Sequence, residues 1–323
     1  MSHTAGAEPG VGAASGPDLA ERVAADGLLA PGREVLVLLS GGRDSTCLLD
    51  LAARIAGPEA VGSLHVNYGL RPAAAADERR CIELCDQLGV KLEVYRPDPH
   101  PVGNLQAWAR DVRYGKAAQL AGTRGADVAA GHTATDQVET ILYRLASSPS
   151  RRALLGMEPR DGALIRPLLH YTRAETAEWC RGQDLDWCED ETNASAAFVR
   201  GRVRHDLVPV LRSIHPGAER NVIAVAEVLR DEAAVLDLLV DEVLDGSEAV
   251  ELARLRRLPQ ALARLVVQRL ADRAAGSLAP GVARRTAELL ALNAEETVRL
   301  DVGAGVRAVV DCGLLRFEPL PSA

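Results

Sequence analysis

A glycine- and serine-rich loop is the part of this sequence whose chemistry is easiest to state. Ser40-Gly41-Gly42-Arg43-Asp44-Ser45 follows a short apolar run and opens a segment with helical spacing. Glycine lets a ligand approach the backbone closely, and the N–H groups and dipole at a helix start favour phosphate. Asp44 would repel a phosphate directly, so we expect it to hold Mg²⁺ that bridges to the phosphates. The Walker sequence G-x-x-x-x-G-K-S/T does not occur in the chain.

A second polar group follows another expected strand. It runs from Gly131 to Thr140 and contains His132, Asp136 and Glu139. On a helix, residues three apart share a face, so the two carboxylates would lie together with His132 just before them. They could hold a metal ion or a cationic amine. Thr133 and Asp136 could equally form a capping box at the helix start, and the residues alone leave both possibilities open.

The elements that must position these groups alternate along the first half of the chain. Apolar patterning predicts strands at 34–39, 61–66, 91–95 and 127–130, and helices at 44–55, 77–88, 104–121, 136–146 and 173–181. Repeated strand–helix units predict an α/β fold with a doubly wound parallel sheet. Right-handed crossovers would then bring the loops after the strands to one edge, where ligands bind.

The character of the sequence changes after His215-Pro216-Gly217. Amphipathic helices are expected at 219–244, 258–274 and 279–292, and alternation around glycines predicts a small β-meander at 298–317. We therefore expect a disordered tail over 1–17, a catalytic domain over 18–216 and a smaller, mainly helical domain over 217–323.

Composition is that of a globular protein. The chain has 323 residues, 47% of them hydrophobic and 25% charged, and its apolar runs are too short to cross a membrane. Residues 1–17 have no apolar core of a secretory signal, so we expect a cytoplasmic location. None of the six cysteines forms a C-x-x-C pair, which favours reduced structural thiols over a metal or redox centre.

Arginine is unevenly distributed. The formal net charge is −8, yet residues 141–173 hold six arginines against two acids, and residues 200–220 hold five against two. Local clusters of this kind can bind nucleic acid even in an acidic protein. A solvated surface is the alternative.

Further motifs along the chain point to one protein family. His65-Val66-Asn67-Tyr68-Gly69-Leu70-Arg71 follows the second expected strand, and the others are Ala109 to Tyr114, Ile165 to Leu169, Glu189 to Asn193 and Arg200 to His205. In this order they resemble the tRNA(Ile)-lysidine synthetases, which belong to the N-type ATP pyrophosphatases. The resemblance runs from about Val35 to Leu211. It implies a Rossmann-like PP-loop domain and a short form without the extra C-terminal domain of longer members.

Four positions depart from the family pattern. Tyr68 and Thr133 stand where the family usually has histidine, Thr135 where it often has aspartate, and Gly201 where it usually has asparagine. Thr135 matters most, because a carboxylate is lost beside the expected ATP site.

The resemblance implies a two-step reaction. ATP adenylates the ring carbonyl of the first anticodon cytidine of tRNA(Ile) with a CAU anticodon, and the ε-amine of free L-lysine then displaces AMP to give lysidine. The implied roles are catalysis by Asp44, Asp136, Glu139 and Arg113, with Asp44 also holding Mg²⁺. ATP would be bound by Ser40, Gly41, Gly42, Arg43, Asp44, Ser45, His65 and His132, and tRNA by Arg200, Arg204, Arg151 and Arg152.

Other functions of the same superfamily remain open from the sequence. A tRNA thiolase would commonly need cysteine pairs, and a small-molecule amidating synthetase would not need the arginine clusters. A nucleotide- or RNA-binding module that has lost catalysis would not need Asp44. A homodimer is an assembly that the sequence leaves open.

Overall fold

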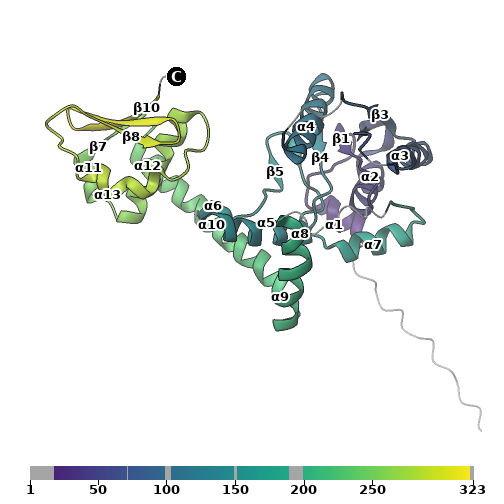
Figure 1. The fold of residues 1–323 in the computed structure, drawn as a ribbon. Helices are drawn as coiled ribbons and strands as arrows, with labels where there is room; N and C mark the ends of the chain where they lie inside the picture. The colour runs from purple at the N-terminus through teal and green to yellow at the C-terminus, as the bar shows by residue number, and fades with distance from the viewer. Residues whose placement is uncertain (1–17, 71, 99–102, 149–150, 189–198, 321–323) are drawn as a thin grey trace, which may run out of the picture. The chain divides into compact units, whose positions relative to one another are not determined.

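The chain folds as two compact units, one ending at Ala226 and one beginning at Glu227. The computed structural model describes residues 18–70, 72–98, 103–148, 151–188 and 199–320 (Figure 1). The division falls inside one long helix, α10 (Ala218–Leu244), a little beyond the change of character after Pro216. Each unit has its own cluster of buried apolar side chains, so each is described by itself.

The first unit is built on a six-stranded sheet in the order β3-β2-β1-β4-β6-β5. Its strands are β1 (Val35–Leu38), β2 (Val61–Val66), β3 (Lys91–Tyr95), β4 (Asp127–Ala129), β5 (Arg160–Asp161) and β6 (Leu164–Ile165). All pairings are parallel except that of β5 with β6. The predicted doubly wound parallel sheet is thereby confirmed. Strand order reverses at β1, which puts the loops after β1 and β4 side by side.

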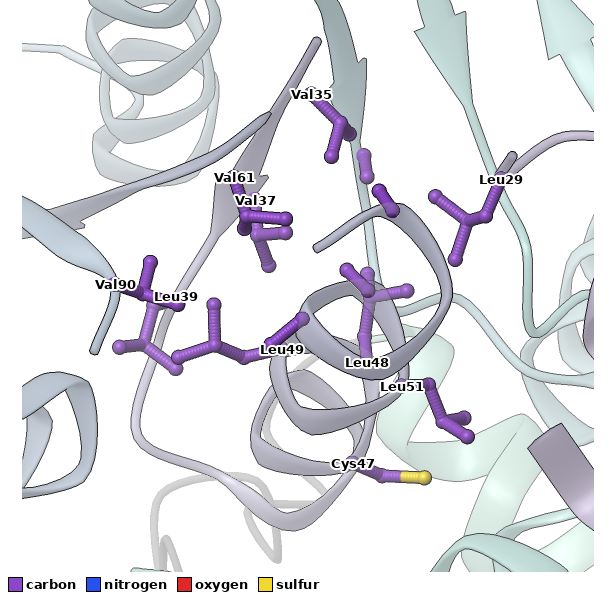
Figure 2. Close-up of a cluster of buried hydrophobic side chains, with 14 of the residues drawn as sticks. Leu29, Val35, Val37, Leu39, Cys47, Leu48, Leu49, Leu51, Val61 and Val90 are labelled. Carbon is purple, nitrogen blue, oxygen red and sulfur yellow. The ribbon is translucent and has the colours of Figure 1, made fainter. Parts of the chain in front are cut away.

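Helices cover both faces of this sheet. Side chains alternate along β1, so Val35, Val37 and Leu39 face one layer while Leu36 and Leu38 face the other. The first layer holds α1 (Leu19–Ala25), α2 (Arg43–Ala56), η1 (Pro58–Ala60), α3 (Ala74–Leu88) and α7 (Arg173–Gly182). The second layer is α4 (Leu105–Arg124). Figure 2 shows the apolar contact between β1 and α2 that fixes the start of α2 beside the sheet edge.

A smaller apolar cluster attaches further helices to the first unit. They are α5 (Ala134–Ser147), α6 (Arg151–Leu154), α8 (Val199–Arg202), the π-helical turn η3 (Val203–Leu207) and α9 (Val208–Ile214). Val138 of α5 packs with Val203 and Val208, and Val222 and Ile223 of α10 lie against them. This packing brings η3 onto α5. Such π-helical turns are frequent at functional sites.

The second unit pairs helices with an antiparallel sheet in the order β7-β10-β9-β8. It contains β7 (Ala249–Glu251), α11 (Leu252–Arg257), α12 (Gln260–Ala275), η4 (Val282–Arg285), α13 (Thr286–Leu290), β8 (Val298–Gly303), β9 (Val306–Asp311) and β10 (Leu314–Pro319). The expected meander is present, with β7 added. The expected helix over 279–292 is wrong, because Gly281 has a φ of +88° and only η4 and the short α13 follow it.

Two sequence observations have direct counterparts in the structure. None of the helices in the described ranges combines the length and apolar character that a membrane crossing requires. All six cysteines are free thiols.

The layer between β1 and α2 should dominate the stability of the first unit. Leu49 on α2 is fully buried in that layer. We predict that Leu49→Ala lowers the free energy of unfolding by about 2–5 kcal/mol, because it removes apolar contacts and leaves a cavity. Urea unfolding followed by tryptophan fluorescence measures this, because all three tryptophans lie in the first unit. Leu145→Ala is the matched control: Leu145 is 58% exposed on α5, and its removal should change stability little. Equal effects of the two changes would contradict this assignment of the core.

Candidate functional site

The two serines of the loop after β1 bond to each other and to the loop backbone. The hydroxyl oxygens of Ser40 and Ser45 lie 3.0 Å apart, and Ser45 Oγ donates to the carbonyl of Gly42 at 2.8 Å. Gly42 is the N-cap of α2, and no side chain caps that helix start. The first N–H groups of α2 therefore stay available to a ligand, as a phosphate site requires.

Two glycines allow backbone segments to meet at this loop. Gly41 has a φ of +83°, and a Cβ there would lie 3.2 Å from Cys81 Sγ. A Cβ on Gly131, directly after β4, would lie 3.0 Å from the carbonyl oxygen of Asp44. The start of α2 and the loop after β4 thus approach each other as closely as backbones can. This contact places the Asp44 region beside the second polar group predicted from the sequence.

Asp44 is clamped by the first turn of α7. Thr176 Oγ1 donates to Asp44 Oδ1 at 2.6 Å, and Arg43 Nε donates to the same oxygen at 3.0 Å. Arg173 Nε lies 3.5 Å from Asp44 Oδ2. Both oxygens of the carboxylate therefore face cationic or hydroxyl donors. The roles of Arg173 and Thr176 were missed from the sequence, and no spacing pattern links them to Asp44.

The carboxylates of α5 join the same cluster. Arg173 donates to Asp136 Oδ1 at 2.7 Å and lies 3.7 Å from Glu139 Oε1. Arg204, carried by η3, grips Glu139 with two bonds, 2.6 Å from Nε to Oε1 and 3.0 Å from Nη2 to Oε2. Arg204 was predicted to contact tRNA, whereas the structure uses its guanidinium inside the site.

Asp136 forms the capping box that the sequence allowed and also pairs with an arginine side chain. Its Oδ2 accepts hydrogen bonds from the Thr133 backbone N–H at 2.9 Å and the Thr133 hydroxyl at 2.8 Å, which completes a capping box. Its Oδ1 meanwhile faces Arg173. Burial raises the pKa of Asp136, but the Arg173 guanidinium and the bonds from Thr133 outweigh it and hold the pKa below its ordinary value. Asp136 is therefore ionised at neutral pH.

Arg204 keeps its charge as well. Burial lowers the pKa of Arg204, but the bonds from its guanidinium to Glu139 outweigh this and raise the pKa. The cluster then balances, with carboxylates from Asp44, Asp136 and Glu139 against guanidiniums from Arg43, Arg173 and Arg204.

His132 follows β4, and the charges of Asp136 and of three arginines act on its imidazole. Burial lowers the pKa of His132 to about 4, the Asp136 carboxylate opposes that shift, and Arg166, Arg113 and Arg110 add to it. Its Nδ1 atom is buried without a hydrogen-bond partner. The imidazole is therefore neutral at pH 7 and has a free position for a ligand or a proton.

The remaining predicted residues fall in different places. His65 is 5% exposed, and its Nδ1 lies 2.9 Å from the carbonyl oxygen of Leu39, directly under the loop. The Nε atom of Arg113 on α4 is buried and has no hydrogen-bond partner. Arg152 is an exposed residue of α6. The side chains of Arg151 and Arg200, and the motif from Glu189 to Asn193, lie outside the described residues.

The arginine cluster counted over 141–173 is not one surface patch. Arg144 donates to the carbonyl of Gly156, Arg160 pairs with Asp127, and Arg166 donates to the carbonyl of Glu158. Counting charge along the sequence could not reveal these partners, because each is brought in by the fold.

The described side chains fit Mg²⁺ only as a single carboxylate ligand beside substrate phosphates. Among the residues the structure describes, no three His, Cys, Asp or Glu side chains converge as a metal cage. Mg²⁺ commonly takes one or two carboxylates, with substrate phosphates and water completing its shell. Asp44, which is 18% exposed at the open loop, can supply one such oxygen.

Comparison with known proteins agrees with this geometry. A family model described as a PP-loop domain matches residues 18–211. The chain is 38% identical over 211 residues to a tRNA(Ile)-lysidine synthase of Pseudomonas fluorescens, covering 63% of this chain and 47% of that protein. It is 37% identical over 260 residues to a tRNA(Ile)-lysidine synthase of Gloeobacter violaceus, covering 75% of this chain and 78% of that protein. The chain thus spans about half the length of the first relative and most of the second.

One solved structure shares the fold. The U34-tRNA thiolase of Methanococcus maripaludis superposes with a TM-score of 0.54 at 18% identity, covering 65% of this chain and 78% of that one. At this identity the likeness concerns the fold alone.

The neutral state of His132 should be visible in stability. The folded-state pKa of about 4 lies below the ordinary 6.5, so the unfolded chain takes up a proton that the folded chain resists. The folded state therefore has its full stability above pH 6.5 and loses stability as the pH falls toward 4. We predict that wild type loses stability relative to His132→Gln by about 1 kcal/mol for each pH unit between 5.5 and 4.5. Urea unfolding of both proteins at several pH values measures this, and a difference that does not vary with pH would contradict it.

Proposed function

Since the chain belongs to the tRNA(Ile)-lysidine synthase family of PP-loop proteins, we propose that it joins free lysine to a cytidine of tRNA at the expense of ATP. The cytidine is the first anticodon nucleotide of tRNA(Ile) with a CAU anticodon. One observation carries the proposal: a helix start without a side-chain cap and a cluster of carboxylates paired with guanidiniums meet at the same sheet edge. A phosphate-activating loop and a site for a cationic amine are the two parts that such a ligase needs.

The first step requires control of the ATP phosphates. The N–H groups at the start of α2 would bind the phosphates, and the hydroxyls of Ser40 and Ser45 belong to the same loop. Mg²⁺ held by Asp44 and phosphate oxygens would neutralise charge that develops as pyrophosphate leaves. Thr176 and Arg173 keep the Asp44 carboxylate in one orientation. His65 supports the loop from below through the Leu39 carbonyl.

The second step requires a lysine held close to the activated cytidine. Glu139 is buried and Asp136 is partly buried, and the present partners of both carboxylates are guanidiniums. An ammonium group of lysine would exchange with one of these guanidiniums and keep the cluster neutral. Holding the amine beside the reacting carbon is then chiefly a matter of proximity.

The departure at Thr135 fits this arrangement. Thr135 is 9% exposed in the first turn of α5, next to Asp136. A carboxylate at that position would add a third negative charge to α5, where Arg173 and Arg204 already pair with Asp136 and Glu139. ATP and tRNA as substrates agree with a cytoplasmic location.

The clamp on Asp44 generates a test of the first step. We predict that Asp44→Ala lowers ATP-dependent adenylation of tRNA at least 100-fold, because the change removes the metal-holding carboxylate. The unfolding free energy should fall by about 1–3 kcal/mol, because the change also removes the acceptor for Thr176 and Arg43, and adenylation is measured where the variant is still folded. Pyrophosphate release in the presence of tRNA measures adenylation. Glu83→Gln, an exposed change on α3, is the control. Adenylation by Asp44→Ala at the rate of Glu83→Gln would show that the loop assignment is wrong.

The identity of the amine tests the second step. We predict that the protein incorporates lysine in preference to ornithine, by about 100-fold, because a stem shorter by one methylene misplaces the nucleophile by about 1 Å. The assay offers each labelled amino acid with ATP, Mg²⁺ and tRNA(Ile) carrying the CAU anticodon. Elongator methionine tRNA is the control and should stay unlabelled. Equal use of ornithine, labelling of the methionine tRNA, or sulfur transfer in place of lysine would refute the proposed activity.

A further inference from the structure

Three arginines near His132 have no acidic partner. Arg110 and Arg113 lie on α4, and Arg166 follows β6. Among the described residues no carboxylate lies within 4.0 Å of their guanidiniums, whereas Arg43, Arg173 and Arg204 each pair with an acid. The two sides of His132 therefore differ: the acidic side is balanced, and the arginine side carries uncompensated positive charge.

Arg166 is the least expected of the three. It is only 6% exposed, its Nε has no hydrogen-bond partner, and Nη1 donates to the Glu158 carbonyl at 2.5 Å. Burial lowers its pKa from the ordinary value. The charges of Asp161 and Glu158 oppose this shift without outweighing it. A buried guanidinium whose counter-charges are not in contact with it gains from a ligand that supplies one. This side chain is therefore built to meet an anion.

The neighbours of Arg166 present donors to the same region. The guanidinium carbons of Arg110 and Arg113 lie 4.7 and 5.2 Å from the ring centroid of Tyr114. Arg113 Nε and His132 Nδ1 are both buried without a partner. Tyr114 of α4 packs with Val128 of β4 and Leu164 of β6 in one apolar cluster, so this contact brings Arg110 and Arg113 to the same part of the sheet as Arg166, which follows β6.

We propose that Arg110, Arg113 and Arg166 form a binding site for a backbone phosphate of the RNA strand next to the target cytidine. The inference rests on the proposed function and adds a subsite to it. Arginine suits this task because its planar fork can bond two phosphate oxygens at once. His132 would then lie between the RNA phosphate and the carboxylates that receive the amine.

The chemistry of the surroundings favours RNA over the other anionic substrates. The carboxylate of lysine is the other anion that an arginine could bond here, and the KM for lysine in the variants distinguishes it from RNA. The phosphates of ATP already have the loop at the start of α2. The chain has only ten aromatic residues, yet three of them are here: Tyr114, and Tyr68 with Trp108 at 5.5 Å between ring centroids. Unpaired bases of RNA stack on such side chains and on arginine.

The test measures RNA binding before any chemistry. Affinity for unmodified tRNA(Ile) is measured without ATP or lysine over a range of salt concentrations, for wild type, Arg110→Gln, Arg166→Lys and Arg79→Gln. Arg79 is an exposed arginine of α3, on the other face of the sheet, so Arg79→Gln is the matched loss of charge. Steady-state KM values for tRNA, ATP and lysine are then determined for the same proteins.

Arg110→Gln should weaken tRNA binding and flatten the logarithmic salt dependence by about 0.7, the value for one single-strand phosphate contact. Arg166→Lys keeps the charge but loses the fork, so it should raise the KM for tRNA at least tenfold and leave those for ATP and lysine unchanged. Arg79→Gln should behave as wild type.

Three results would overturn the inference. The first is an unchanged salt dependence in Arg110→Gln, and the second is a higher KM for lysine or ATP with normal tRNA binding. If Arg166→Lys does not fold, Arg110→Gln decides alone. The third result, a wild-type protein that binds no tRNA, would overturn the proposed function as well, whereas the first two leave lysine incorporation by wild type intact.

Discussion

Three carboxylates can share one sheet edge only if positive charge lies among them. Two like charges about 4 Å apart repel by roughly 4 kcal/mol at an effective dielectric constant of about 20. Arg173 removes this penalty for Asp44, Asp136 and Glu139 together, with its guanidinium nitrogens at 3.5, 2.7 and 3.7 Å from the three carboxylates. Everything else in the site depends on this side chain, because α2 and α5 could not otherwise present their acids side by side.

The balanced cluster has a consequence for substrates. A cation that enters a neutral cluster gains little unless it replaces a charge already there. Arg204 is suited to such an exchange, since it is carried by the π-helical turn η3 and not by the sheet. Arg173 is fixed by the first turn of α7, where Thr176 also bonds Asp44. The guanidinium of Arg173 thus holds the carboxylates together, while that of Arg204 lies where an incoming ammonium would bind. The unpaired arginines on the far side of His132 give the site an opposite end for an anion.

The sequence predicted the strands and helices better than the side-chain contacts of the site. Strands 61–66 and 91–95 have the predicted bounds, because apolar runs between clear turn signals leave few alternatives. The loop after β1 was found from its glycines and its place between strand and helix. The expected helix over 279–292 is wrong because Gly281 has a positive φ, and the spacing of apolar residues carries no information about that angle. Arg173 and Thr176 were missed because they reach Asp44 from about 130 positions away, as the fold alone dictates. The bonds from Arg204 to Glu139 were likewise not visible in the sequence, because the two residues are 65 positions apart, and its role toward tRNA stays a prediction.

The central claim is that the loop and the balanced cluster act in sequence on one RNA nucleotide. The most direct measurement is to incubate the protein with tRNA(Ile) and ATP labelled at the α-phosphate, first without lysine and then with it. The account predicts that label becomes attached to the tRNA when lysine is omitted, and leaves as AMP when lysine is added. Label on lysine or on the protein, or no RNA adduct while lysine is still incorporated, would contradict it.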